Sequence, residues 1–199
     1  MTCDDRYPAN TVRSILDTHL ITPSTAAALH ARLAEPAGGD VFDALARKNF
    51  RAACDGLIPQ SDRSNPIDLA SIVEGRLANG GGGDGWRYAD MPEDVAVLRS
   101  GLAAIDASAH GVFGTGFADL DTMARDRLLT SVQHGDVPPD LWTVLDPKRW
   151  FETLLVAVTE AYYAHPLAQE EIGYLGMADA RGWPDVGLGA RAPHEPDPL

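Results

Sequence analysis

Asp106, Ser108 and His110 are close together in the sequence and are the residue types of a nucleophilic catalytic triad. In a triad, the histidine takes the proton of the serine hydroxyl while the carboxylate orients the histidine ring. The nucleophile also needs a sharp turn and an oxyanion hole of backbone N–H groups, and the sequence around residue 108 predicts neither. We therefore interpret the histidines as surface or helix-capping residues. They are His19, His30, His110, His134, His165 and His194.

Metal chemistry would need ligands at a spacing that the chain does not show. A di-iron site in a helical bundle uses Glu-x-x-His pairs. Glu152 and Glu160 lack such a histidine, and His165 lies five residues after Glu160. Cys3 and Cys54 form no Cys-x-x-Cys or Cys/His cluster of the kind that binds zinc. We expect two free thiols with Cys54 buried, a single disulfide being the alternative, and no metal in this chain.

Two glycine-rich stretches could be compared with nucleotide-binding loops. Gly80–Gly85 has no Lys-Ser/Thr after it, and the glycines at 111, 114 and 116 follow a predicted helix. A dinucleotide fingerprint needs a strand–turn–helix context, because the pyrophosphate lies at the helix N-terminus. Both stretches are therefore predicted to be loops, and no cofactor is predicted in this chain.

An aromatic segment between residues 150 and 183 has the most distinctive composition. A strongly apolar helix, WFETLLVAVTEAYYAHP, is followed by a Gly-rich segment without helical periodicity. Tyr and Trp are enriched at interface centres, because they bury a large area and keep a polar group. These aromatics either cover one end of the chain's own core or form a partner interface. The candidate interface residues are Tyr162, Tyr163, His165, Pro166, Tyr174 and Trp183.

The elements that must position these residues are predicted to be helices. Thr22-Pro23 and Asp146-Pro147 each supply an N-cap followed by proline at the first helical position. Apolar residues recur at spacings of three and four along the intervening segments, which is typical of amphipathic helices. Helices are predicted over residues 10–20, 22–33, 41–57, 66–77, 95–109, 117–132, 141–145 and 147–165.

The fold class that follows is all-α, a helical bundle with long loops and an irregular aromatic, Gly-rich C-terminal tail. Residues 79–92 form a Gly-rich insertion, and Pro166 is expected to end the last long helix. We predict a single α-helical domain over residues 1–189. The Pro-rich residues 190–199 are expected to form a disordered tail.

Composition limits the classes of partner. The chain of 199 residues is 45% hydrophobic and 23% charged, as in ordinary globular proteins, and has a net charge of −13. Such a surface repels polyanions, so nucleic acid is an improbable ligand class. No run of about 18 apolar residues is present, so no membrane span is expected. The polar N-terminus shows no export signal.

The chain resembles the gluconate 2-dehydrogenase subunit 3 family. The matching pieces are FRAACDGLIP near residue 50, the segment 117–132 ending in LLTSV, WFETLLVAVTEAYYAHP, and the tail IGYLG…GWPDVGLG. They occur in the family's order between about residues 42 and 189. Two features depart from many members: Leu167-Ala168-Gln169 replaces a Gly-Gly-Asn, and there is no twin-arginine signal.

This resemblance implies a non-catalytic accessory (small) subunit of a membrane-associated or soluble FAD-dependent dehydrogenase for sugars, polyols or sugar acids. Such a subunit supports the folding, stability or export of the catalytic subunit. The implied partner is a large FAD-containing catalytic subunit of the glucose–methanol–choline (GMC) type. A cytochrome c subunit is a further candidate in the same complex. FAD would lie in the partner.

Two alternative functions stay open at this point. The chain could be a dissociable chaperone that leaves the catalytic subunit after folding it. It could also be a small stand-alone helical enzyme with His110 or His165 as the base. The expected location is the cytoplasm, or the periplasm by co-export with a partner that has a signal.

Overall fold

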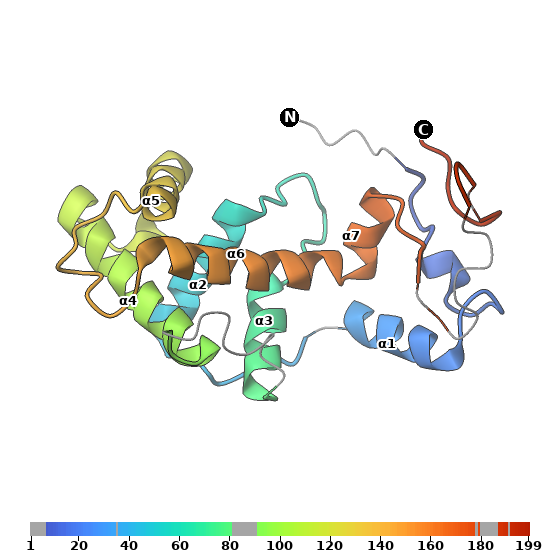
Figure 1. Ribbon diagram of the computed structural model, residues 1–199, viewed down its shortest axis with the longest axis horizontal. Helices are drawn as coiled ribbons and strands as arrows, with labels where there is room; N and C mark the ends of the chain where they lie inside the picture. Colours follow the sequence, from blue (N-terminus) through green and yellow to red (C-terminus); the bar gives the residue numbers. More distant parts are fainter. Residues whose placement is uncertain (1–6, 35, 81–90, 178, 180–186, 191) are drawn as a thin grey trace. The chain divides into compact units, whose positions relative to one another are not determined.

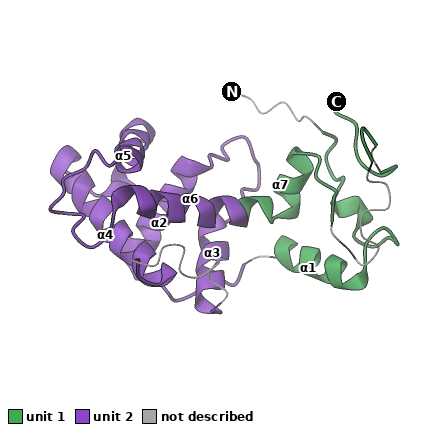
Figure 2. Ribbon diagram, viewed as in Figure 1, with its two compact units in different colours: residues 1–35, 162–199 green, residues 36–161 purple. Residues whose placement is uncertain are grey.

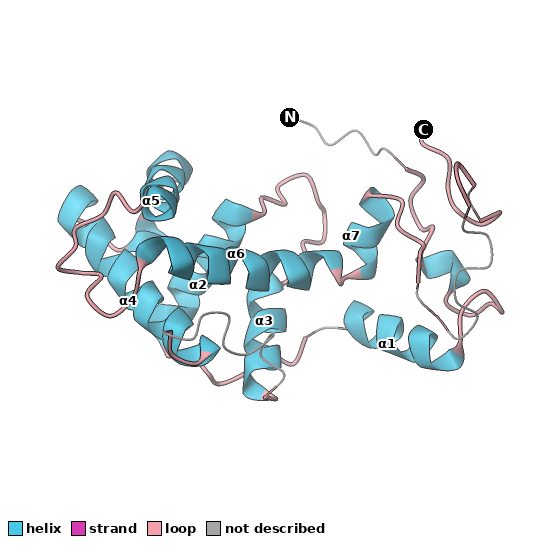
Figure 3. Cartoon of the chain, in the orientation of Figure 1, coloured by secondary structure: helices cyan, strands magenta, loops and turns pink. Residues whose placement is uncertain are grey.

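A computed structural model describes residues 7–34, 36–80, 91–177, 179, 187–190 and 192–199. Over these residues the regular secondary structure is entirely helical, with seven α-helices and two short 3-10 helices (Figures 1 and 3). The predicted all-α class is therefore confirmed. Within this part of the chain, no helix has the length and apolar character needed to cross a membrane.

The chain divides into two compact units (Figure 2). Unit 1 combines residues 1–35 with residues 162–199, and unit 2 comprises residues 36–161. The boundary falls inside one helix, α6, which runs from Pro147 to Tyr163. The predicted single domain over residues 1–189 and the disorder of residues 190–199 stay predictions.

Unit 2 contains most of the helices, and four of them begin at an aspartate. The carboxylates of Asp43, Asp68, Asp121 and Asp146 each accept a hydrogen bond from the backbone N–H three residues later, at 2.8–3.1 Å. Each cap satisfies one of the N–H groups that a helix leaves unpaired at its start. The four capped helices are α2 (Ala44–Leu57), α3 (Leu69–Ala78), α5 (Thr122–His134) and α6 (Pro147–Tyr163), and the fifth helix is α4 (Asp94–Phe113).

The core of unit 2 is formed around a tryptophan that packs directly against a glycine. Trp150 of α6 is fully buried, and a Cβ added to Gly101 of α4 would lie 1.9 Å from its indole Nε1. Trp142 packs against Trp150 with ring centroids 5.3 Å apart and an interplanar angle of 60°. Only glycine at position 101 lets α4 and α6 approach so closely. Other fully buried side chains of this unit include Phe50, Val97, Leu98, Leu102, Ile105, Phe117, Val132, Leu154 and Val158.

A buried ion pair fixes the segment that precedes α2. The carboxylate of Glu74, 3% exposed, accepts hydrogen bonds from the N–H groups of Val41 and Phe42 at 3.2 and 3.0 Å. Arg47 donates to both oxygens of the same carboxylate at 2.9 Å. Arg99 of α4 adds a hydrogen bond from Nε to the Val41 carbonyl at 2.8 Å. Residues 41–47 are thereby held against both α3 and α4.

Unit 1 contains the 3-10 helix η1 (Arg13–Ile15), α1 (Pro23–Leu33) and the short α7 (Pro166–Glu171). As predicted, Thr22 caps α1, and Pro23 is its first residue. The unit has its own apolar core, because a separate cluster of buried side chains joins the N-terminal segment to Leu175. That cluster comprises Val12, Ile15, Leu16, Ile21, Leu29 and Leu175.

Two of the helices predicted in unit 2 are wrong. Residues 141–145 are turns, because Trp142 enters the core there. The predicted helix 117–132 is divided into η2 (Phe117–Asp119) and α5. At the start of α5, Asp121 caps the helix, and the Arg125 guanidinium donates to the Ala118 and Leu120 carbonyls.

Two asparagines have roles that the sequence did not predict. In α2, Leu45 is 56% exposed, whereas the side chain of Asn49 is buried. The side-chain oxygen of Asn49 accepts the Ala118 N–H at 3.2 Å, which explains why an amide is buried there. The predicted helix over residues 10–20 is wrong, because Asn10 adopts a left-handed conformation with φ of 68° and only the 3-10 helix η1 follows it.

Gly101→Ala should lower the free energy of unfolding by about 3 kcal/mol, because the new methyl group must displace the Trp150 ring from a filled core. Gly111→Ala is the matched control. It lies in the same helix with open space around it, and should raise stability by about 0.5–1 kcal/mol. Urea titration followed by circular dichroism measures both. Equal effects of the two variants would contradict the close packing of α4 on α6.

Candidate partner-binding surface

The structure separates the predicted interface residues into two groups. Tyr163 and Tyr174 are 49% and 43% exposed. Tyr162, His165 and Pro166 are buried. Trp183 lies outside the described residues. The interface itself stays a prediction, with Tyr163 and Tyr174 as the described side chains that a partner could reach.

The turn between α6 and α7 is built from side chains that bond to the backbone. His165 caps α7, its Nδ1 accepting the Leu167 N–H at 3.3 Å, and Pro166 occupies the first helical position. Gln169 donates from Nε2 to the Tyr163 carbonyl at 3.1 Å. Pro166 therefore ends α6 and also begins a second helix, which the sequence did not predict. Proline suits both positions because it lacks the N–H that a first helical residue leaves unpaired.

Tyr162 supports the exposed Tyr163. Its hydroxyl donates to Glu171 Oε2 at 2.5 Å. Its ring meets that of Tyr163 edge to face, with centroids 5.2 Å apart and an interplanar angle of 81°. Edge-to-face pairs add to the stabilisation that burial provides. Tyr162 is thus part of the support for the surface, whereas Tyr163 belongs to the surface itself.

Glu170 anchors α7, a role that the sequence did not predict. This carboxylate is 5% exposed. It accepts the backbone N–H groups of Asn10 and Arg13, both at 3.0 Å. The Arg13 guanidinium also donates to it, from Nε at 3.1 Å and from Nη2 at 2.9 Å. The residues are about 160 positions apart, and nothing in the spacing indicates the pair.

The hydrogen bonds of Glu170 change its ionisation. Burial disfavours the charged carboxylate and by itself would raise the pKa. The hydrogen bonds from the Arg13 side chain and from the Arg13 and Asn10 backbone outweigh burial, so the pKa of Glu170 lies below its usual value. Hydrogen bonds to a charged form favour that form. Glu170 therefore stays ionised at neutral pH and holds α7 against the N-terminal segment.

Three large apolar side chains are exposed along this anchored turn. Tyr163, Ile172 and Tyr174 are between 43% and 49% exposed; we name these three residues the α6–α7 edge. The Tyr174 hydroxyl donates to the Gly176 carbonyl at 2.7 Å, and its backbone N–H donates to the Gln169 carbonyl at 2.9 Å. These two hydrogen bonds hold Tyr174 against the backbone at the C-terminal end of α7.

The structure does not assemble Asp106, Ser108 and His110 into a triad. Ser108 is fully buried; its hydroxyl donates to the Ala104 carbonyl at 2.8 Å and accepts the Trp142 indole N–H at 3.2 Å. The His110 ring is exposed and lies 3.7 Å from Asp106. Asp106 in turn accepts the Phe117 N–H at 2.9 Å. Serine and histidine thus have different partners, and the geometry offers no proton transfer between them.

The cysteines and the possible metal ligands are the remaining candidates for chemistry. Cys54 is a buried free thiol, and its burial raises the pKa well above the usual range, with Asp55 and Asp68 adding to the shift. Such a thiol is unreactive, because the thiolate is the nucleophile. Cys3 lies outside the described residues. The part of the chain that is described contains no group of three or more side chains placed to bind a metal ion.

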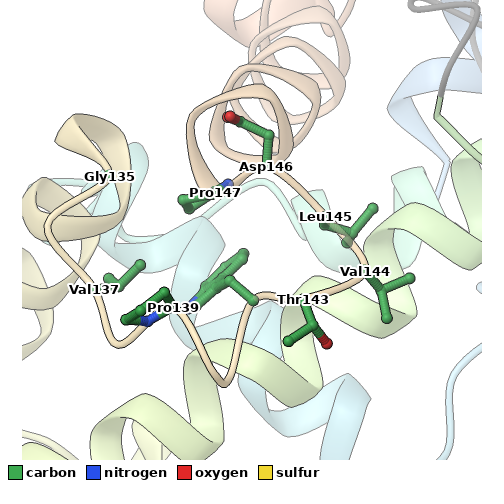
Figure 4. Close-up of a pocket in the computed structure, with 9 residues that line it drawn as sticks. Gly135, Val137, Pro139, Thr143, Val144, Leu145, Asp146 and Pro147 are labelled. Atoms are coloured by element: carbon green, nitrogen blue, oxygen red, sulfur yellow. The ribbon is translucent and has the colours of Figure 1, made fainter.

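A pocket of about 370 Å³ lies beside the connection between α5 and α6. It is lined by Gly135, Val137, Pro139 and residues 142–147 (Figure 4). None of the predicted interface residues lines it. The signal in the sequence is the segment VPPDLWTVLDP, which is apolar although it is not helical.

Comparison with protein families matches residues 46–178 to the family described as Gluconate 2-dehydrogenase subunit 3. The match covers both the long helix α6 and the α6–α7 turn. No curated protein and no solved structure matches the chain.

Glu170→Gln should destabilise unit 1 by about 2 kcal/mol at pH 7, because the amide leaves buried donors of Arg13 and Asn10 unpaired. The folded pKa is lowered, so the stabilisation is present above the unfolded value of about 4.3 and is lost as pH falls through the folded pKa. The difference between wild type and variant should therefore vanish in acid. Hydrogen exchange of residues 10–16 and 166–175 measures it.

Asp17→Asn is the control for this prediction, because the Asp17 side chain is 91% exposed. It should leave exchange unchanged at every pH. A difference between wild type and Glu170→Gln that persists at low pH would contradict the assignment to the ionised carboxylate.

Proposed function

The chain belongs to the gluconate 2-dehydrogenase subunit 3 family, and we propose that it is the non-catalytic accessory subunit of an FAD-dependent GMC-type dehydrogenase. Members of the family are subunits of a dehydrogenase complex. In this proposal, the large partner binds FAD and oxidises a sugar, polyol or sugar acid. A cytochrome c subunit that accepts the electrons is a further candidate member of the complex.

The observation that carries the proposal is the α6–α7 edge. Its three apolar side chains are exposed, yet they lie on a turn that is fixed by the buried Glu170–Arg13 pair and by the His165 cap. A surface that is ordered before binding loses less conformational entropy when a partner docks. Exposed tyrosines on such a surface suit a stable protein–protein contact.

The buried positions of the remaining candidate residues support the same division of roles. Tyr162 and His165 are used to hold the turn. Ser108 is used to hold Trp142 in the core. The polar groups that could have suggested catalysis thus have structural partners, which favours a role in binding and stabilising the catalytic subunit. We place the complex in the cytoplasm, or in the periplasm after co-export with a signal-bearing partner.

Tyr163→Ala combined with Tyr174→Ala should weaken binding to the catalytic subunit. Truncation of an interface hot spot costs about 2 kcal/mol or more, which is about 30-fold in Kd. The dissociation constant of the purified chain for the FAD-containing subunit, measured by biolayer interferometry, checks this. Circular dichroism should remain unchanged, because neither side chain belongs to the buried core.

The matched control is Leu45→Ala, which removes an apolar side chain that is 56% exposed on α2. It should bind like the wild type. Equal affinity of the tyrosine variant and the control would show that the edge is not the interface. Wild-type binding that is lost once the catalytic subunit is folded would instead identify a dissociable chaperone.

A further inference from the structure

We propose that Asn79, at the C-terminal end of α3, is a site of spontaneous deamidation, which converts its side-chain amide to a carboxylate and loosens the segment that packs on α3. The reagent is water, and the products are aspartate and isoaspartate at position 79. The proposal concerns unit 2 alone and does not rest on the proposed function.

The reaction needs an asparagine that is followed by a small residue with a backbone N–H. The Gly80 nitrogen attacks the side-chain carbonyl carbon of Asn79, and a C–N bond forms. The side-chain nitrogen leaves as ammonia, together with the proton of the Gly80 N–H. The resulting cyclic succinimide takes up water. Opening at the side-chain carbonyl gives aspartate, and opening at the backbone carbonyl gives isoaspartate, in which the main chain runs through the side chain.

The other three asparagines of the chain are poor candidates for this reaction, each for a different reason. Asn65 precedes a proline, which has no N–H to attack with. Asn49 is 1% exposed, so water does not reach it. Asn10 precedes a β-branched threonine, whose side chain crowds the attacking nitrogen. Asn79 alone precedes a glycine.

The structure leaves this pair accessible to solvent and weakly held. Asn79 and Gly80 are both exposed, and a Cβ placed on Gly80 would meet no neighbouring atom within 4 Å. The Gly80 N–H donates to the Leu77 carbonyl at 3.3 Å, which is long for such a bond. The Asn79 amide donates from Nδ2 to the Gly75 carbonyl at 2.8 Å. Attack requires both bonds to open, and the last turn of a helix opens readily.

A second pair of the same type shows what packing changes. Asp55 precedes Gly56, and an aspartate before glycine forms the same succinimide with loss of water. Gly56, however, lies within α2, and a Cβ placed on it would lie 2.9 Å from the Leu129 side chain of α5. The backbone of this pair is therefore held by a neighbouring helix. The end of α3 at Gly80 has no such contact.

Deamidation would remove the cap at the end of α3 and add an unfavourable charge. The neutral amide of Asn79 donates to the Gly75 carbonyl. A carboxylate only accepts hydrogen bonds, so it would repel that oxygen. A negative charge at the C-terminal end of a helix is also unfavourable, because the helix end carries a partial negative charge itself. Isoaspartate in addition lengthens the main chain at this point. The last turn of α3 should therefore unwind.

This turn supports the segment that leads into α2. A Cβ on Gly39 would lie 2.6 Å from the Glu74 carbonyl oxygen, and one on Gly75 would lie 3.1 Å from the Gly38 carbonyl oxygen. The two backbones are thus in direct contact, and the Glu74 carboxylate holds the two N–H groups that follow. Unwinding the end of α3 would remove the surface on which residues 38–42 pack.

Peptide mapping by mass spectrometry, after incubation of the purified full chain in mildly alkaline buffer, tests the site. The peptide with Asn79 should progressively gain the mass of deamidation, and more slowly in mildly acidic buffer, because attack needs the deprotonated Gly80 nitrogen. An isoaspartyl methyltransferase should label the same peptide. The peptides with Asn10 and Asn49 should stay unchanged, as should the variant Asn79→Gln, whose longer side chain cyclises far more slowly. No gain at Asn79, or an equal gain at Asn10 or Asn49, would overturn the assignment.

The structural consequence is tested with Asn79→Asp, which has the charge of the product from the start. Hydrogen exchange of residues 38–42 and 72–79 should be several-fold faster than in the wild type. Asn65→Asp is the matched control, because it adds the same charge at an exposed position outside the helices, and it should exchange like the wild type. Equal exchange in the two variants would show that the cap does not hold the segment and would overturn the proposed loosening.

Discussion

Each unit depends on one buried glutamate that binds a segment from elsewhere in the chain. Glu74 on α3 accepts two backbone N–H groups and the Arg47 guanidinium. Glu170 on α7 does the same with Asn10 and Arg13. A buried carboxylate is costly unless it is paired and hydrogen-bonded. If the bound segment lay elsewhere, the buried carboxylate would lose its arginine and both N–H groups, and its charge would be unpaired. The arrangement therefore specifies one path for each segment.

The Glu170 network connects this constraint to function. A six-residue helix such as α7 (Pro166–Glu171) has too few internal hydrogen bonds to be stable alone. Its order comes from the His165 cap, the Gln169 amide and the Glu170–Arg13 pair. These contacts determine where Tyr163, Ile172 and Tyr174 lie. The α6–α7 edge is thus held in place by groups that are not themselves part of the proposed contact.

Local signals allowed much of the fold to be predicted. Thr22-Pro23 and Asp146-Pro147 begin helices where the N-cap and proline rules place them. The wide apolar face of α6 is buried through Trp150, Leu154 and Val158. These features depend on neighbours in sequence. The buried glutamates do not, because their arginine and N–H partners are 27 to 160 residues away, and a glutamate on a helix ordinarily indicates an exposed face.

The sequence indicated a segment for the candidate site but not which of its side chains are exposed. The segment around Tyr163 and Tyr174 was recognised from its aromatic content, but the sequence could not divide it into surface and support. That division depends on whether a hydroxyl or ring nitrogen finds a partner within the turn, as Tyr162 and His165 do. The sequence predicted that Pro166 ends a helix but not that it begins another. Proline occurs both after helix ends and at the first position of helices, so the residue type alone does not distinguish the two. The α5–α6 pocket escaped prediction because it depends on Trp142 entering the core from a turn.

The central claim is that this chain serves a catalytic centre in another subunit. Its most direct test is to co-express the chain with the large FAD-containing subunit and analyse the mixture by size-exclusion chromatography with light scattering and flavin absorbance. The account predicts one equimolar complex that contains the flavin and has dehydrogenase activity, and an isolated chain with neither. Separate elution of the two chains, or flavin and sugar oxidation in the isolated chain, would contradict it.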